Sequence, residues 1–247
     1  MRSGAMRAAL FAVSIAGGCY NPTPVPLTPC DTTDQCPGTL ECIDHRCGGT
    51  PNDAAPDAFV PDGTMLAHVV IGTSAGDVRD TELADYDPSK NFASDNHTSV
   101  DSGESSLIWF DIEAHIPTTK TVSSATLTVT VADEADEAGG TVEIHRLKES
   151  WVETEVTWIS RNAQIGWLAA GALPPMSSDA TPMATFRPDG IGKTIDISLP
   201  VAVVQGWVTM PGSNHGIIIV RGTSQEHVHL NSHDSAGPWS KLTIDYY

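Results

Sequence analysis

The chain has 247 residues, which is enough for one large domain or for a large domain with a small appendage. It carries 31 acidic and 13 basic side chains. The resulting formal charge of -18 argues against binding of nucleic acid and against binding of anionic membrane surfaces by charge. No apolar run reaches the length of about 18 residues that a membrane-spanning helix requires.

Residues 1–18 have the features of a bacterial secretion signal. Two arginines open the segment, Ala8–Ile15 is apolar, and three small residues precede Cys19. Small residues that end at a cysteine resemble the lipobox of bacterial lipoproteins, which implies that Cys19 is acylated and becomes the mature N-terminus. We therefore expect an exported protein that is lipid-anchored to the bacterial cell envelope, at the outer membrane or cell surface. The alternative is an ordinary signal peptide cut near Gly18, which leaves Cys19 as a free thiol.

Residues 19–47 are interpreted as the lipidated N-terminus and a small cysteine-rich module. Its four cysteines are Cys30, Cys36, Cys42 and Cys47. In an exported protein this even set predicts two disulfides, and the sequence leaves all three pairings open. Zinc is the less favoured alternative because it prefers C-x2-C pairs. So short a segment buries too little apolar surface to fold without such cross-links.

Residues 48–64 are rich in proline, alanine and aspartate and show no apolar period, so they are predicted to be an extended linker. From residue 65 the pattern becomes that of strands, with Ser105–Val131 at its centre. There, apolar residues alternate with other residues in two runs that are separated by Pro117, a period of two that is typical of half-buried antiparallel strands. Residues 74–100 are acidic and lack this period, so we interpret them mainly as a loop.

The remaining strands are shorter and lie between turn signals. They are predicted at 67–71, 141–148, 183–186, 193–197, 216–221, 227–231 and 241–246. Leu199–Val208 is the best helix candidate, with Ser198 as N-cap and an apolar stripe that includes Val204 and Trp207. With the two central strands this makes about nine strands. The predicted fold of residues 65–247 is therefore all-β, a jelly-roll-type antiparallel β-sandwich with one short helix.

Several motifs in residues 65–247 occur in an order that resembles DNRLRE-domain proteins, a group related to carbohydrate-binding modules. The matching segments are Leu107–Asp111, Val122–Leu127, Val142–Trp158, Gln205–Val208 and Asn214–Ile217. The namesake string is present only approximately, at His145–Glu149. The resemblance implies a β-sandwich of the kind attached to extracellular enzymes or surface proteins, some of which bind polysaccharide.

Trp109 is the leading candidate for a sugar-binding residue. If Ile108, Phe110 and Ile112 face the core, Trp109 points outward, and a flat indole face fits the C–H face of a pyranose ring. The alternative is that a loop, such as residues 166–179, covers it. Trp167 and Trp239 are secondary candidates. The family motifs place Trp151, Trp158 and Trp207 in packing positions, and we expect them to be buried.

His227 and His229 flank Val228 on a predicted strand. If Val228 and Leu230 point inward, both imidazoles lie on the outer face, where they can contact a glycan. Two histidines at this spacing can also hold a metal, with His233 or Glu226 as a third ligand. Two exposed histidines without a ligand are the commoner arrangement.

A third candidate site is the oxygen-rich stretch within residues 74–100. Its candidate ligands for a structural calcium ion are Asp77, Asp80, Asp85, Asp87 and Asn91. Calcium takes six to eight hard oxygen ligands, and jelly-roll carbohydrate modules often carry such an ion. The stretch lacks EF-hand spacing, and the acidic excess of the whole chain also produces clusters of this kind by chance.

No catalytic pattern stands out, because carboxylates are plentiful and none is singled out as an acid–base pair, and there is no G-x-S-x-G motif. We therefore expect no enzyme and no certain cofactor. The favoured function is a surface-anchored, noncatalytic lipoprotein that binds polysaccharide or envelope glycan and meets the membrane only through its N-terminal lipid. The alternative is a structural or protein-adhesion domain of the cell envelope without a sugar ligand. The oligomeric state stays open.

Overall fold

The computed structural model describes residues 29–36, 40–43, 45–47, 65–74, 76–135, 140–188, 190–222 and 227–247. Contacts divide the chain into two units, Met1–Gly63 and Thr64–Tyr247. The predicted signal peptide, Cys19 and the predicted linker at 48–64 lie outside the described residues. In the part of the chain that is described, no helix is both long and apolar enough to cross a membrane.

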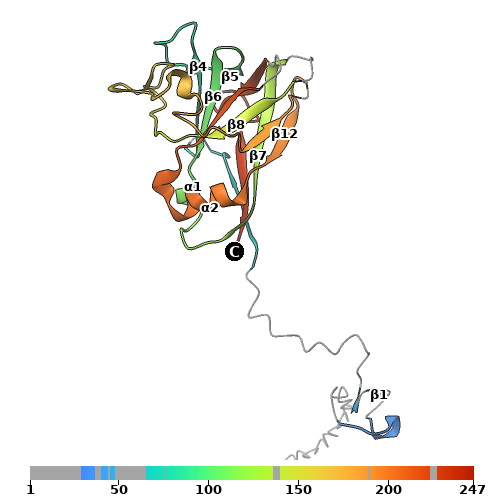
Figure 1. Ribbon diagram of the computed structural model, residues 1–247. Helices are drawn as coiled ribbons and strands as arrows, with labels where there is room; N and C mark the ends of the chain where they lie inside the picture. Colours follow the sequence, from blue (N-terminus) through green and yellow to red (C-terminus); the bar gives the residue numbers. More distant parts are fainter. Residues whose placement is uncertain are drawn as a thin grey trace, which may run out of the picture. The chain divides into compact units, whose positions relative to one another are not determined.

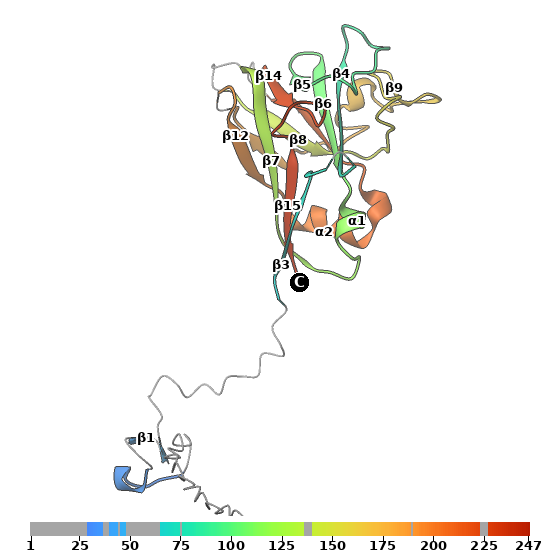
Figure 2. The same ribbon diagram turned by 180° about the vertical axis from the view of Figure 1, so that it is seen from behind.

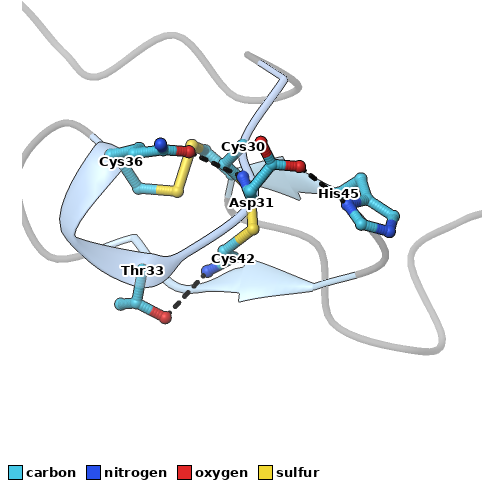
Figure 3. The surroundings of a disulfide bond; sticks show 8 residues. Cys30, Asp31, Thr33, Cys36, Cys42 and His45 are labelled. Carbon is cyan, nitrogen blue, oxygen red and sulfur yellow. Dashed lines mark hydrogen bonds and ion pairs between the residues drawn. A yellow bond between two sulfur atoms is a disulfide. The ribbon is translucent and has the colours of Figure 1, made fainter.

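The first unit is held by the two predicted disulfides, which join Cys30 to Cys42 and Cys36 to Cys47 (Figure 3). Its elements are η1 (Thr33–Gln35), β1 (Cys42–Ile43) and β2 (Arg46–Cys47). The hydroxyl of Thr33 accepts a hydrogen bond from the backbone N–H of Cys42. All four thiols are thereby used in cross-links, which removes the zinc alternative.

The regular secondary structure of the second unit is mostly β-strand. Its strands are β3 (Ala67–Ile71), β4 (Val78–Ala84), β5 (His97–Val100), β6 (Glu104–Phe110), β7 (Val122–Ala135), β8 (Val142–Arg146), β9 (Ser160–Asn162), β10 (Ile165–Gly166), β11 (Ala184–Phe186), β12 (Thr194–Ser198), β13 (Ile217–Arg221), β14 (Val228–Asn231) and β15 (Lys241–Tyr246). Its helices are α1 (Ile112–His115), η2 (Ala170–Ala172), α2 (Val201–Thr209) and η3 (Pro211–Ser213).

Two antiparallel sheets form the predicted jelly-roll-type sandwich (Figures 1 and 2). One sheet has five strands in the order β11-β8-β13-β6-β4. The other has six, in the order β3-β15-β7-β14-β5, with β12 paired to β7. The long strand β7 organises this second sheet, because it pairs in turn with β15, β12 and β14. Helices α1 and α2 lie at the end of the sandwich where β15 ends (Figure 1).

The five-stranded sheet is buried on both faces. Toward the other sheet, Ile108 and Phe110 join the main core together with residues of β7 and α2. On its outer face, Leu107 and Ile218 pack in a second apolar cluster beneath residues of the connection between β8 and β11. The second half of β6, residues 107–110, is therefore continuously apolar, as strands covered on both faces are.

The predicted alternation in β6 is confirmed, with one adjustment at its end. Ile112 is buried in the core as expected, but it begins α1 and does not continue the strand. The side chain of Asp111 accepts a hydrogen bond from the backbone N–H of Ala114 and so caps this single turn.

Two other predictions need correction. Most of residues 74–100 lies outside strands, as predicted, but the segment also contains two strands that were not predicted, β4 and β5, and β4 pairs along its whole length with β6. The helix starts at Val201, after Pro200, and Ser198 is not its cap. Ser198 instead ends β12, where it pairs with Thr126. The expected apolar stripe of the helix is confirmed, since Val204 and Trp207 are buried in the main core.

Candidate functional site

A pocket of about 350 Å³ opens on the outer face of the five-stranded sheet. It is lined by Arg79, Trp109, Ser150, Trp151, Gly212, Asn214 and His215. Arg79 lies on β4 and Trp109 on β6, where the register places them directly opposite each other. The guanidinium carbon of Arg79 lies 3.9 Å from the centroid of the indole ring. A cation–π contact thus holds the guanidinium over the Trp109 ring at the wall of the pocket.

The connection from α2 to β13 fixes both indoles of the pocket. The Nε1–H of Trp109 donates to the carbonyl oxygen of Asn214, and the Nε1–H of Trp151 donates to that of His215, each at 3.0 Å. The Asn214 side chain in turn donates to the carbonyl of Phe110. Because the polar atoms of both indoles are satisfied by backbone, what Trp109 offers to the pocket is apolar ring surface.

The charge in this pocket comes from Arg79. Its side chain is exposed, and within the described residues it makes no hydrogen bond or ion pair beyond its contact with the Trp109 ring. In a chain with 31 acidic side chains, such an arginine keeps its donors available to a ligand. Burial, followed by the nearby charges of Arg161 and Arg146, lowers the pKa of His215 below its ordinary value of 6.5. His215 is therefore neutral at pH 7 and can both donate and accept.

The three tryptophans predicted as candidates for sugar binding differ in their exposure and contacts. Trp109 points away from the main core, as expected, but it is half-buried and carries Arg79 on its ring. Trp167 is not a platform, because only 8 % of it is exposed and its Nε1–H donates to the carbonyl of Thr157 in the second cluster. Trp239 is half-buried beside Gly237 and bonds to the carbonyl of Ser235.

A second pocket, of about 480 Å³, lies on a different part of the same unit. Trp158, Leu173 and Val220 form its apolar wall, and Asp85, Asp101, Glu104 and Arg221 are its charged lining residues. Trp158 is partly buried against the second cluster, in agreement with the packing role predicted for it. Trp151 and Trp207 are buried, which also agrees with the prediction. Burial, reinforced by the charge of Glu82, raises the pKa of Glu104. This pocket is acidic where the first one is cationic.

His227 and His229 lie on the outer face of the six-stranded sheet, as the parity of β14 predicts, because Val228 and Leu230 are fully buried. Their neighbours differ from the predicted ones. His233 binds Asp80, and Glu226 lies outside the described residues. His229 instead contacts His97 and Asp133, and His227 contacts Asp101.

The structure does not bring the five predicted calcium ligands together. Asp77 binds His115, the buried Asp80 binds His233, and the Asn91 amide donates to two backbone carbonyls. Asp85 lies at the acidic pocket, and Asp87 is exposed. The physical reason is that the extended strand β4 (Val78–Ala84) runs between Asp77 and Asp85, so the residues before it and those after it lie at opposite ends of the strand.

Comparison with known proteins points to a binding module. Residues 75–172 match the model of carbohydrate-binding module family 96. This segment includes Arg79, Trp109, Ser150 and Trp151 of the first pocket, while the Gly212–His215 side lies beyond it. No curated protein matches the chain. The described sandwich therefore contains a domain similar to a carbohydrate-binding module.

Proposed function

We propose that the second unit is a noncatalytic carbohydrate-binding module that takes polysaccharide into the Arg79–Trp109 pocket. The observation that carries the proposal is the exposed guanidinium of Arg79, held on an indole ring inside a segment that matches a carbohydrate-binding module model. The volume of the pocket, about 350 Å³, lies within the range of roughly 300–1,000 Å³ typical of ligand sites.

The lining of the pocket suits a saccharide. Because Arg79 lies over the Trp109 ring, the sugar would pack against the indole surface that Arg79 leaves uncovered, and the guanidinium would donate hydrogen bonds to hydroxyl or carboxylate oxygens. Ser150 and the neutral His215 add groups that both donate and accept, as sugar hydroxyls require. None of these contacts needs a nucleophile or an acid–base pair, and binding without catalysis is what they support.

The proposed cellular context comes from the sequence. Acylation at Cys19 would attach the chain to the cell envelope, and the segment at 48–64 would act as a spacer between the cysteine-rich module and the sandwich. A binding module presented in this way would hold the cell, or an associated enzyme, against polysaccharide.

Arg79→Ala is expected to lower glycan affinity by at least about tenfold, because a charge-assisted hydrogen bond contributes about 1.5–3 kcal/mol. The measurement is binding of the purified full chain to an array of neutral, acidic and amino sugars, followed by titration with the best ligand. Arg79 is exposed, so the substitution should leave the fold intact. Arg187→Ala removes another exposed arginine, from outside the pocket, and serves as the matched control.

Trp109→Phe provides a second test, since it keeps an aromatic ring but loses the hydrogen bond to Asn214 and part of the ring surface. Equal glycan affinity of wild type, Arg79→Ala and Trp109→Phe would move the binding site away from this pocket. A folded chain that binds none of the sugars would overturn the proposal. It would favour an adhesion domain, for which the exposed side chains of Ile159, Ile165 and Leu168 around the β9–β10 hairpin offer an apolar surface.

A further inference from the structure

Three histidines and an aspartate gather on the outer face of the six-stranded sheet. His97 lies on β5, His229 on β14 and Asp133 on β7, and His227 immediately precedes β14. These residues come from three separate parts of the chain. They share no lining residue with the Arg79–Trp109 pocket.

The contacts within this cluster are close. The rings of His97 and His229 are stacked with their centroids 4.1 Å apart, and the Nδ1 of His229 lies 2.9 Å from Oδ1 of Asp133. One ligand atom each from His97, Asp133 and His229 can be chosen so that all three lie within 4.8 Å of one another. The centroid of the His227 ring lies 4.9 Å from that of the His229 ring.

Strand pairing explains how the three side chains meet. In the β5–β14 ladder His97 is opposite Asn231, so it is the diagonal neighbour of His229 on the same face. Between β14 and β7 the register shifts, because Val228 pairs with Ala135 but Leu230 pairs with Val131. The β7 residues 132–134 therefore lie opposite His229 alone. Bulges of this kind redirect side chains, and here the irregularity brings Asp133 to His229.

We propose that His97, Asp133 and His229 bind one divalent transition-metal ion of the zinc class. Two imidazoles and a carboxylate are ligands that zinc accepts, whereas calcium prefers oxygen alone. At zinc bond lengths of about 2.0–2.1 Å, tetrahedral ligand atoms are roughly 3.4 Å apart. Small side-chain rotations from a spread of 4.8 Å bring the three atoms to that distance.

The fourth coordination position has room beside the cluster. A cavity of about 290 Å³ is lined by His97 and Asp133 themselves, together with Asn96, Ala132 and Asn231 and the turn at residues 235–237. A water or a ligand donor atom placed there would complete a tetrahedron. Asp133 is the most exposed of the three proposed ligands, with 73 % of its side chain accessible, so an ion can reach the cluster from solvent.

The test is titration of the metal-free full chain with Zn²⁺ in competition with a chromophoric chelator. We expect one ion per chain with a dissociation constant in the micromolar range or tighter. His97→Ala and His229→Ala should each weaken binding at least about tenfold, as even supporting residues of metal sites do. Co²⁺ in place of Zn²⁺ should give the visible absorption of a tetrahedral nitrogen–oxygen site, without a thiolate charge-transfer band, and so separate this site from Cys19.

Two variants decide the assignment. His68→Ala removes a histidine that pairs with a single carboxylate, Asp245, at 2.8 Å, and should leave zinc affinity unchanged. His227→Ala tests the neighbouring group formed with Asp101 and Glu104. Loss of zinc in His227→Ala but not in His97→Ala would overturn the proposed ligand set. So would a folded wild-type chain that binds no Zn²⁺ at about 100 μM, or equal zinc affinity in the His97→Ala, His229→Ala and His68→Ala chains.

Discussion

His233→Ala is expected to lower the free energy of unfolding by about 3 kcal/mol, because it removes the imidazole that pairs with a buried carboxylate. The partner is Asp80 of β4, which is only 2 % exposed. Its two oxygens accept from His233 twice, at 3.1 Å from the ring Nδ1 and at 2.8 Å from the backbone N–H. Because β4 belongs to one sheet and His233 to the connection between β14 and β15 of the other, the pair joins the two halves of the sandwich.

Urea unfolding of the full chain, followed by tryptophan fluorescence, measures this loss. His68→Ala is the matched control, because it removes a histidine–aspartate pair in which 61 % of the histidine side chain is exposed. Exposed pairs contribute about 0–1 kcal/mol, so the control should unfold close to wild type. Equal destabilisation by the two substitutions would show that burial of Asp80 does not determine the cost.

The same pair predicts how stability depends on pH. The hydrogen bond to Asp80 raises the pKa of His233 from 6.5 to about 9, although burial opposes the shift. Asp80, Glu153 and Asp234 are the charged groups that face it, and all three favour its cationic form. Burial raises the pKa of Asp80 itself, and the titration of this carboxyl affects stability at acidic pH.

A raised histidine pKa stabilises the folded state fully below the unfolded value of 6.5, and this stabilisation is lost as pH rises through about 9. We therefore expect the melting temperature of wild type to fall between about pH 6.5 and 9, and His233→Ala to show a flatter curve. In Asp80→Asn, the NMR titration of the His233 ring should move back toward 6.5, because the carboxylate is gone. Parallel melting curves for wild type and His233→Ala would contradict the assignment.

Strand β4 also shows why part of the fold could not be predicted from the sequence. Apolar alternation and turn signals predicted β6, β7 and the later strands other than the short β9 and β10. In β4 the residues Asp80, Thr81 and Glu82 are polar and buried. The two carboxylates are tolerated because their partners come from elsewhere in the chain: His233 for Asp80, and the backbone of Ser99 for Glu82. A prediction based on the alternation of apolar residues therefore assigns such a strand to a loop.

The candidate site was predictable to the same limited extent. Parity correctly placed Trp109 away from the main core, but the arginine on its ring follows from the β4–β6 register, which requires β4 to be recognised first. Likewise, the sequence placed His229 on the outer face but missed His97, whose strand lay in the assumed loop. Trp167 was misjudged because its burial depends on loop packing, which has no period in the sequence.

Gly216→Ala should destabilise the fold by about 3 kcal/mol and impair the proposed sugar pocket as well. Gly216 has a φ of +86°, a region that side-chain-bearing residues rarely adopt, and a Cβ there would overlap the carbonyl oxygen of Ile108 on β6. To relieve the overlap, the backbone at Asn214 and His215 has to move. Their carbonyls hold the indoles of Trp109 and Trp151, so we expect glycan affinity to fall together with stability.

Gly206→Ala separates this local effect from a general cost of replacing glycine. Gly206 lies inside α2, and a Cβ placed there meets no atom within 4 Å. Alanine at a helix interior is favoured over glycine by roughly 0.5–1 kcal/mol, so this variant should unfold at a higher urea concentration and bind glycan as wild type does. If Gly216→Ala kept wild-type stability, the close approach to Ile108 would not constrain the pocket. If it lost stability but kept full glycan affinity, the sugar would not depend on the two indoles that the Asn214–Gly216 backbone positions.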